Sequence, residues 1–283
     1  SDPLGRTIEA AFALLADGST AVVEVAAASG LGLVSEQERD ALAASTRGTG
    51  ELVLAALQAG ARTVLVAAGG SASTDGGRGA IEVIRDGGGL RGARLEVLCD
   101  TDEPFERAAT VFAPQKGADA RSVAQLDRRL EGLAHELPRD PRGRPRTGAA
   151  GGLAGGLWAA FDAALSSGAE RVLTAVDAPA RLAASRWVIS GEGCLDSQSL
   201  HGKLVGRLAR LCAEIPRPLA VIAGRVELDE QELAGASISR ASEARTLAAI
   251  EDVACRWGAE CANEHPASSD GSRRPERPGA PAG

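Results

Sequence analysis

Short apolar segments alternate with longer helix-forming segments along most of this 283-residue chain, and that order constrains the fold most strongly. The expected strands span residues 62–68, 94–99, 171–175, 187–190 and 218–223. The expected helices span residues 35–44, 50–59, 78–87, 119–137, 149–165, 203–214 and 243–257. Such alternation favours an α/β fold with mostly parallel strands. Two earlier strands, 6–15 and 20–26, flank an Asp17-Gly18 turn and predict an antiparallel hairpin as the exception.

Composition supports a folded core and argues against two classes of partner. Hydrophobic residues make up 44% of the chain, and its length allows two domains. Aromatic residues make up only 2% and the net charge is −7, so the chain lacks the stacking side chains and the basic face of nucleic-acid binders. No apolar run reaches the length of a membrane span. We therefore expect neither nucleic acid nor a membrane as a partner.

The cysteines and the two ends of the chain give weaker expectations. Five cysteines occur, an odd number, and no two have Cys-x-x-Cys spacing, so we do not expect a disulfide framework. We expect a cytoplasmic location, where cysteines stay reduced. The chain begins at Ser1 and contains no methionine, from which we expect its natural start to have been lost or trimmed. Residues 263–283 are rich in Ser, Pro, Arg and Gly and are expected to form a disordered tail.

The most unusual loop is GGSASTDGG, residues 69–77, between an expected strand and an expected helix. Its glycines allow backbone N–H groups to approach an anion closely, and the start of a helix adds partial positive charge. Asp75 repels phosphate in the same loop unless a cation lies between them. The loop is therefore either a phosphate-and-metal loop or a tight structural turn, and Gly-rich structural turns are common.

Three further loops carry charged residues at positions where α/β proteins bind ligands. They are CDTDEPF (99–105), APQKGA (113–118) and GEGCLDSQSLHGK (191–203). Their carboxylates are suited to Mg²⁺ and their lysines to phosphates, a combination that suits phosphoryl transfer. Ordinary alternatives stay open: solvated lysines, strand-end carboxylates, a turn cap at Asp196 and a bystander Cys194. The P-loop motif GxxxxGK[ST] does not occur.

In order and wording, these loops resemble the bacterial glycerate kinase family that is unrelated to P-loop kinases. The matching segments run in the family's order over about residues 1–260. They are DPLGR (2–6), AVVEVAAASGL (21–31), TRGTGEL (46–52), GGSASTDGG (69–77), VLCDTDEPF (97–105), VFAPQKGA (111–118), GAAGGLAGGL (148–157) and GEGCLDSQSLHGK (191–203). The resemblance therefore covers nearly the whole chain.

The resemblance implies an α/β fold of two domains, a flavodoxin-like domain that is incomplete here and an inserted restriction-enzyme-like domain. Residues 1–183 would form the inserted domain with its Gly-rich loop, and residues 184–262 the C-terminal portion of the flavodoxin-like domain. The family's N-terminal segment, with Asp-Ser-Phe-Lys-Gly and Ala-Asp-Gly-Gly-Glu-Gly motifs, does not occur in this sequence. An incomplete parallel sheet exposes edges and apolar surface. We therefore expect the smaller domain to be unstable alone or to pair with another chain, which could be a second copy of this one.

The implied activity is glycerate kinase: transfer of the γ-phosphoryl group of ATP, with Mg²⁺, to a hydroxyl of D-glycerate. In many bacterial members the product is 2-phosphoglycerate. Residue chemistry and family position assign catalytic roles to Asp196, Glu192 and Asp75, with Asp196 as the candidate acceptor of the hydroxyl proton. Asp100 and Asp196 are the expected metal ligands. The expected substrate or phosphate contacts are Gly69, Gly70, Ser71, Gly76, Gly77, Lys116 and Lys203.

Three departures from the family pattern keep other functions open. The first is the absence of the N-terminal segment, whose first motif supplies a lysine to the expected active cleft. Cys194 stands where relatives usually have Arg, which removes a fixed cation that Cys does not replace. Glu103 replaces the Asn of an Asn-Pro pair and adds a carboxylate beside Asp100 and Asp102. The loop at 69–77 also differs mildly from Gly-Gly-Ser-Ala-Thr-Asn-Asp-Gly-Gly. The alternatives are a degenerate, non-catalytic relative that binds a small acid or a partner protein, and a kinase for another small hydroxy acid.

Overall fold

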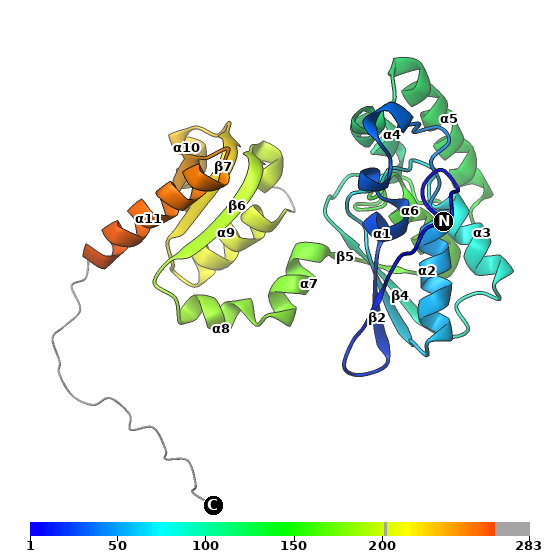
Figure 1. The fold of residues 1–283 in the computed structure, drawn as a ribbon, viewed down its shortest axis with the longest axis horizontal. Coiled ribbons are helices and arrows are strands. Elements are labelled where there is room, and N and C mark those ends of the chain that lie inside the picture. The colour runs from blue at the N-terminus through cyan, green and yellow to red at the C-terminus, as the bar shows by residue number, and fades with distance from the viewer. Residues whose placement is uncertain (201–202, 264–283) are drawn as a thin grey trace, which may run out of the picture.

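The structure, a computed structural model, describes residues 1–200 and 203–263 and contains two α/β units, each with its own sheet (Figure 1). The first sheet has the order β1-β2-β3-β4-β5, formed by Ala13–Leu14, Thr20–Glu24, Thr63–Ala67, Arg94–Cys99 and Ala164–Ser167. The second has the order β6-β7-β8, formed by Val188–Leu195, Leu219–Val226 and Ile238–Glu243. Between the two sheets the chain forms α7 (Gly168–Ala175) and α8 (Ala178–Ala183).

Strand pairing confirms the mostly parallel α/β architecture. Neighbouring strands run parallel in both sheets except for β1 and β2, which pair antiparallel as the Asp17-Gly18 turn predicted. The Asp17 carboxylate accepts hydrogen bonds from the backbone N–H groups of Ser19 and Thr20, both at 2.8 Å, which stabilises the turn. Strand β1 is shorter than predicted, because only Ala13 and Leu14 pair with β2.

The core of the first unit lies between its sheet and three helices, α2 (Arg47–Gln58), α3 (Arg78–Asp86) and α6 (Leu153–Phe161). Val64 and Val66 of β3 are fully buried in the same cluster as Val53 of α2 and Leu157 of α6. Burial of a side chain of this size contributes about 1.5–3 kcal/mol. This packing fixes the sheet, and with it the loops that leave the carboxyl ends of its strands.

A second apolar cluster supports the loop after β4. Phe105 is fully buried with Leu126, Leu130 and Leu133 of α5 (Ala120–Glu136). Helix α5 begins after Asp119, whose side chain accepts a hydrogen bond from Ser122 N at 2.8 Å. The first unit also contains the short helices α1 (Val25–Ser29) and α4 (Ala108–Phe112), and the second unit contains the short helix α10 (Glu230–Gly235). The 3-10 turns are Leu31–Leu33, Glu36–Glu38, Phe105–Arg107, Pro114–Lys116 and Ser197–Leu200.

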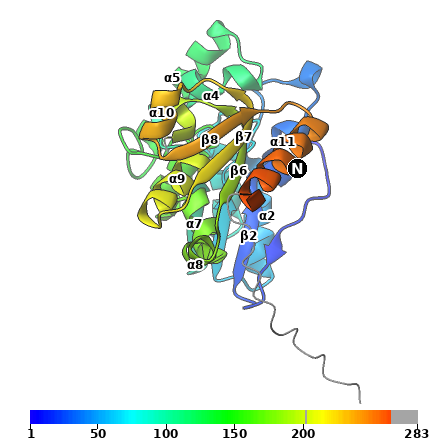
Figure 2. The ribbon, with the colours of Figure 1, turned by 90° about the vertical axis from the view of Figure 1, so that its left-hand side faces the viewer.

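Two helices, α9 (Leu204–Glu214) and α11 (Leu247–Asn263), cover opposite faces of the second sheet (Figure 2). Val205 of α9 shares a core cluster with Val221 of β7. On the other face, Trp257 of α11 packs with Ala220 and Ile222 of the same strand. Strand β7 is therefore the buried centre of this unit, and within the described residues β6 and β8 are its edges.

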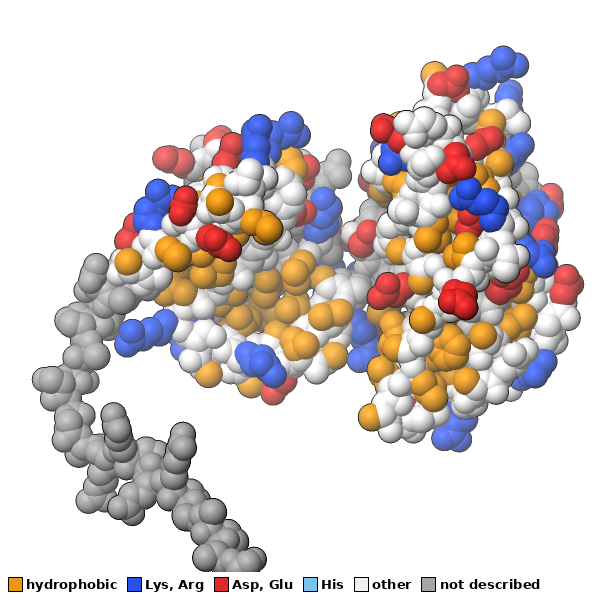
Figure 3. All heavy atoms as spheres, viewed as in Figure 1, with side chains coloured by type: hydrophobic (Ala, Val, Ile, Leu, Met, Phe, Trp, Pro, Cys, Tyr) orange, Lys and Arg blue, Asp and Glu red, His pale blue; other side chains and the backbone are white. Residues whose placement is uncertain are grey.

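An apolar cavity of about 250 Å³ lies between β6 and α11, where hydrophobic side chains gather (Figure 3). Trp187 and Trp257 line it, and Ile189 of the edge strand β6 is 56% exposed beside them. In the first unit, by contrast, Trp158 lies against Arg139 and Arg144, whose Cζ atoms are 4.2 and 4.7 Å from its ring centroid. The three tryptophans of the chain thus lie in two different environments.

Two secondary-structure predictions are wrong, and one strand of the structure was not predicted. The helix expected at 35–44 is a single 3-10 turn: the Ser35–Glu38 capping box forms, but the side chain of Asp40 then accepts hydrogen bonds from the N–H groups of Leu42 and Ala43 and holds a turn. Residues 171–175 belong to helix α7 and not to a strand. Strand β8 was not predicted, because only Ile238 among its residues is buried.

The misplaced strand has a local cause. Helix α6 ends at Asp162, whose φ of 58° is left-handed, so residues 164–167 are free to form β5. The Ser167 side chain then accepts a hydrogen bond from Glu170 N at 3.3 Å and begins α7.

The predicted domain boundary after residue 183 falls at the end of α8, and the division into family domains stays a prediction. Residues 264–283 of the expected disordered tail lie outside the described residues, whereas residue 263 ends α11. None of the described helices combines the length and the apolar character that crossing a membrane requires.

Candidate functional site

A cleft of about 680 Å³ lies where the carboxyl end of β4 faces residues that follow β6. It therefore has walls from both units. Its lining residues are Asp100, Thr101, Asp102, Glu103, Pro104, Val111, Phe112, Gln115, Ser197 and Lys203. Three of the residues predicted from the sequence are close to this cleft: Asp100 and Lys203 line it, and Glu192 pairs with Lys203.

Glu192 and Lys203 form an ion pair, with Lys203 Nζ 3.2 Å from Glu192 Oε1. Lys203 precedes the first turn of α9, and Glu192 lies on β6. The other carboxylate oxygen, Glu192 Oε2, is buried and has no hydrogen-bond partner among the described residues. A buried carboxylate oxygen without a donor is the kind of atom that a cation or a ligand proton satisfies.

Three carboxylates follow β4, and two of them have fixed cationic partners. Asp102 pairs with Arg146 at 2.9 Å, and Glu103 pairs with Arg107 at 2.8 Å. Asp100 is exposed to the cleft, but surrounding protein raises the pKa of its carboxyl, and the charges of Lys203 and Lys116 only partly oppose this effect. Among these three carboxylates, Asp100 is therefore the one most available to a ligand.

Lys116 lies beneath the loop of residues 69–77. Its side chain is only 3% exposed, and Nζ donates hydrogen bonds to Ser71 Oγ at 2.9 Å and to the Ser73 carbonyl at 2.5 Å. Burial lowers the pKa of this ammonium to about 8, opposed by the nearby carboxylates of Asp75 and Asp100. Lys116 is therefore not a solvated surface lysine, and its two hydrogen bonds hold loop 69–77 in place.

Asp75 joins the same loop to two helix starts. Its carboxylate accepts hydrogen bonds from the Thr46 backbone N–H at 2.9 Å and the Thr46 hydroxyl at 2.8 Å. It also accepts from the N–H groups of Gly77 at 3.0 Å and Gly79 at 3.2 Å. Thr46 precedes α2 and Gly77 precedes α3, so one side chain fixes both helices relative to the loop.

Close packing requires glycine at position 76 of loop 69–77 and at position 156 of α6. Gly76 has φ of 65°, and a Cβ there would lie 2.4 Å from Leu133. The predicted loop at 148–157 packs directly on it: Gly76 N donates to the Gly151 carbonyl at 3.0 Å, and a Cβ on Gly156 would lie 2.1 Å from the Gly76 carbonyl. Ser71 is buried, Gly69 lies near Asp100, and Gly70 and Gly77 have left-handed φ values.

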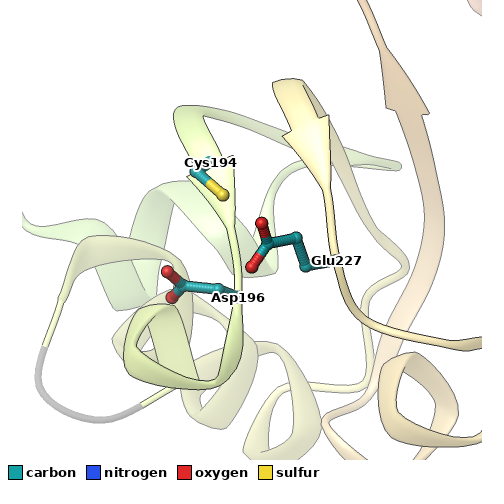
Figure 4. A group of neighbouring side chains, drawn as sticks. All are labelled: Cys194, Asp196 and Glu227. Carbon is teal, nitrogen blue, oxygen red and sulfur yellow. The ribbon is translucent and has the colours of Figure 1, made fainter.

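Asp196 lies in a different group of side chains, at the end of β6. Its Oδ1 accepts a hydrogen bond from Ser199 N at 2.9 Å, which stabilises the turn after the strand. Cys194, Asp196 and Glu227 each offer a ligand atom, and these atoms lie within 4.8 Å of one another (Figure 4). Arg225 lies beside them, 2.7 Å from the Glu227 carboxylate and 3.7 Å from Cys194 Sγ.

These positions decide which residues suit Mg²⁺. Mg²⁺ prefers oxygen ligands and is usually held by one or two carboxylates together with substrate phosphates. The carboxylates of Asp196 and Glu227 and the unpartnered Glu192 Oε2 fit that requirement, whereas the thiol of Cys194 does not. Asp100, the other predicted ligand, lies outside the Cys194–Asp196–Glu227 group within the described part of the chain.

Sequence reasoning missed Arg225 and Glu227. Both lie at the end of β7, where Cys194 pairs in register with Arg225. The predicted strand 218–223 ends three residues before β7 does, so Arg225 and Glu227 fell outside the predicted loops. The position of a residue just beyond a buried strand was the signal available in the sequence.

Comparison with known proteins agrees with the family resemblance over nearly the whole chain. A family model described as the glycerate kinase family matches residues 1–85 and 88–261. Glycerate 2-kinase of Escherichia coli is 36% identical over 262 residues, which cover 80% of this chain and 69% of that protein. Glycerate kinase of Bacillus subtilis is 39% identical over 265 residues, with the same two coverages. The chain thus spans about 69% of the length of these relatives.

A solved structure gives the same result for the fold. The crystal structure of a glycerate kinase homologue from Salmonella typhimurium LT2 is similar with a TM-score of 0.65 and 31% sequence identity. The similarity covers 92% of this chain and 81% of the other.

Proposed function

The chain belongs to the glycerate kinase family, and from that membership we propose that it transfers the γ-phosphoryl group of ATP to a hydroxyl of D-glycerate. We propose 2-phosphoglycerate as the product, because the similar Escherichia coli protein is described as a glycerate 2-kinase. The observation that carries this proposal is the 680 Å³ cleft, in which the Lys203 ammonium and the Asp100 carboxylate face one space.

In the proposed reaction, the protein mainly positions charged groups, because the phosphoryl group passes through a loose transition state. Lys203 would contact a phosphate, and Glu192 would hold the ammonium in place through their 3.2 Å contact. Asp196 would accept the hydroxyl proton, from the turn that Ser199 stabilises. Mg²⁺, when bound, would neutralise phosphate charge, with Asp196 and its neighbour Glu227 as proposed ligands and Asp100 as a proposed ligand from the β4 side of the cleft.

We assign the remaining predicted residues to the wall of the cleft. Asp75 and Lys116 each bond to loop 69–77, so they would act by holding its backbone in place for the substrate. The loop glycines, and Ser71 beside Lys116, would supply that backbone. Asp75 and Lys116 are thus proposed as positioning residues, since their polar atoms already bond within the protein.

The structure offsets two of the departures that favoured a non-catalytic relative. Arg225 brings a guanidinium group to within 3.7 Å of Cys194, so a cation is present beside the position that lost one. The added carboxylate of Glu103 is paired with Arg107 and does not add an isolated negative charge to the cleft. Both observations support the kinase over the degenerate relative.

The test is an assay of this chain with D-glycerate, ATP and Mg²⁺, with the products identified by ³¹P NMR. We expect ADP and 2-phosphoglycerate to form in equal amounts, and we expect neither from the Asp196→Asn variant. Glycerate-dependent ADP release that is no faster than in Asp196→Asn would contradict the proposal. A phosphorylated product from another hydroxy acid, but not from glycerate, would support the kinase for a different substrate.

A further inference from the structure

A second groove, of about 620 Å³, opens at the carboxyl ends of the three strands β6–β8. It is formed by the strand ends, the connection from β8 to α11 and the first turn of α11. Its lining residues are Glu192, Gly193, Cys194, Gly224, Arg225, Ala244, Arg245, Thr246, Leu247 and Ile250. Ligands of parallel α/β sheets bind beyond the carboxyl ends of the strands, which is the location of this groove.

One side of the groove is apolar and uncovered. Leu247 is 80% exposed and Ile250 is 39% exposed, although both are large hydrophobic side chains. A single exposed leucine is ordinary, but these two lie three residues apart on the first turn of α11 and line the same groove. Together they offer an apolar surface against which a purine base can pack.

The groove lining also includes two guanidinium groups, those of Arg225 and Arg245. Arg225 lies beside Cys194 and Glu227, and Arg245 Nε donates a hydrogen bond to the Gly224 carbonyl at 3.0 Å. Arginine is well suited to phosphate, because its planar group donates parallel hydrogen bonds to two oxygens. The backbone between them is close-packed: a Cβ on Gly224 would lie 2.6 Å from the Gly193 carbonyl.

The groove meets the proposed catalytic cleft at one ion pair. Glu192 lines the groove, its partner Lys203 lines the cleft, and their charged atoms are 3.2 Å apart. A ligand that fills both spaces must therefore be elongated, with an apolar ring at one end and anionic groups that reach Lys203 at the other.

We propose that the groove binds the nucleoside end of ATP, with the base against Leu247 and Ile250 and the phosphates extending past Arg225 toward Lys203. This inference rests on the proposed kinase function and adds the location of its nucleotide. Glycerate would then occupy the cleft lined by Asp100, on the other side of the Glu192–Lys203 pair.

The experiment measures binding of ADP with Mg²⁺ and of D-glycerate, separately, by isothermal titration calorimetry. The test variants are Arg225→Gln and Leu247→Asp, both at exposed side chains. Matched controls are Arg210→Gln on α9 and Val172→Asp on α7, which are exposed and lie outside the groove. We expect ADP affinity to fall by about tenfold or more in each test variant, with glycerate affinity and melting temperature unchanged, and no loss in the controls.

The outcomes separate this inference from the proposed function. Unchanged ADP affinity in both test variants, or no ADP binding by the wild-type chain, would overturn the nucleotide location. In the first case glycerate phosphorylation could still occur, and the kinase assignment would stand. Loss of ADP affinity in the variants of a chain that never phosphorylates glycerate would support the location and refute the glycerate kinase function. If Leu247→Asp lowers the melting temperature, Ile250→Ser replaces it.

Discussion

The ammonium group of Lys203 lies 3.2 Å from Glu192 Oε1, so a single ion pair joins strand β6 to the start of α9. The pair separates the cleft lined by Asp100 from the groove lined by Leu247. Because Glu192 Oε2 has no partner among the described residues, the pair is incomplete without a further donor or cation. This arrangement makes Glu192 a sensitive point for testing the site.

The Glu192→Gln variant should lose most of its activity and keep its fold. The neutral amide no longer balances the Lys203 charge, so the ammonium is no longer held toward the phosphates. We expect kcat to fall by about a hundredfold, a typical effect of losing one preorganised polar group at a reacting centre. The matched control is Glu170→Gln, which breaks the Arg207–Glu170 ion pair between α7 and α9 but lies outside the cleft lining. Equal activity of the two variants would remove Glu192 from the site.

Replacement of Asp196 by Asn should abolish turnover without unfolding the chain. The amide oxygen of Asn can still accept the hydrogen bond from Ser199 N, so the turn is preserved, whereas the base and metal ligand are lost. We expect kcat to fall by about a thousandfold. Asp252→Asn on the exposed side of α11 is the control. Turnover near that of the control, measured by coupled ADP release, would refute the role of Asp196.

Removal of the Asp75 carboxylate should affect stability strongly. In Asp75→Ala the N–H groups of Thr46, Gly77 and Gly79 lose their acceptor in a mostly buried location. We expect the free energy of unfolding to fall by roughly 2–4 kcal/mol, as for other buried donors left without partners. Urea unfolding of this variant beside Asp86→Ala, an exposed aspartate at the end of α3, measures the difference. A difference well under about 1 kcal/mol would show that other groups fix the loop.

Lys116 should make stability depend on alkaline pH. Its pKa is about 8 in the folded chain against an ordinary value of 10.5, so between these values the unfolded chain binds more protons. Stability therefore rises with pH in that window, by about 2 kcal/mol between about pH 7 and pH 9.5. Subtracting the free energy of unfolding of Lys116→Met removes the opposite effect of Cys99, whose pKa burial raises to about 12. A difference that stays constant with pH would show that Lys116 titrates normally.

Sequence periodicity located the elements whose buried faces are continuous and missed those decided by local contacts. Strand β4 was predicted at its observed residues because Leu95, Val97 and Cys99 alternate with less buried neighbours. Strand β8 has little apolar character and is held by pairing with β7, a contact between segments distant in the sequence. Helix α7 contains β-branched residues that favour a strand, but the Ser167 cap overrides them.

The candidate site shows the same division between residue type and residue geometry. The sequence indicated which loops carry carboxylates and lysines, because these loops follow apolar strands. It did not indicate that Asp75 points to Thr46 or that Lys116 is buried, since both contacts join loops that are far apart in the chain. Nor did it pair Cys194 with Arg225, which depends on the register of β6 against β7.

The positions of the three tryptophans allow the fluorescence of each unit to be measured separately. The chain contains three tryptophans and no tyrosine, so its ultraviolet emission comes essentially from indole alone. Trp158 lies against two guanidinium groups in the first unit, whereas Trp187 and Trp257 line the apolar cavity beside α11 in the second. Two substitutions of Phe for Trp, at 187 and 257, would leave one emitter in the first unit. Comparing its emission with that of a Trp158→Phe chain during denaturation would reveal whether the two sheets melt together or in sequence.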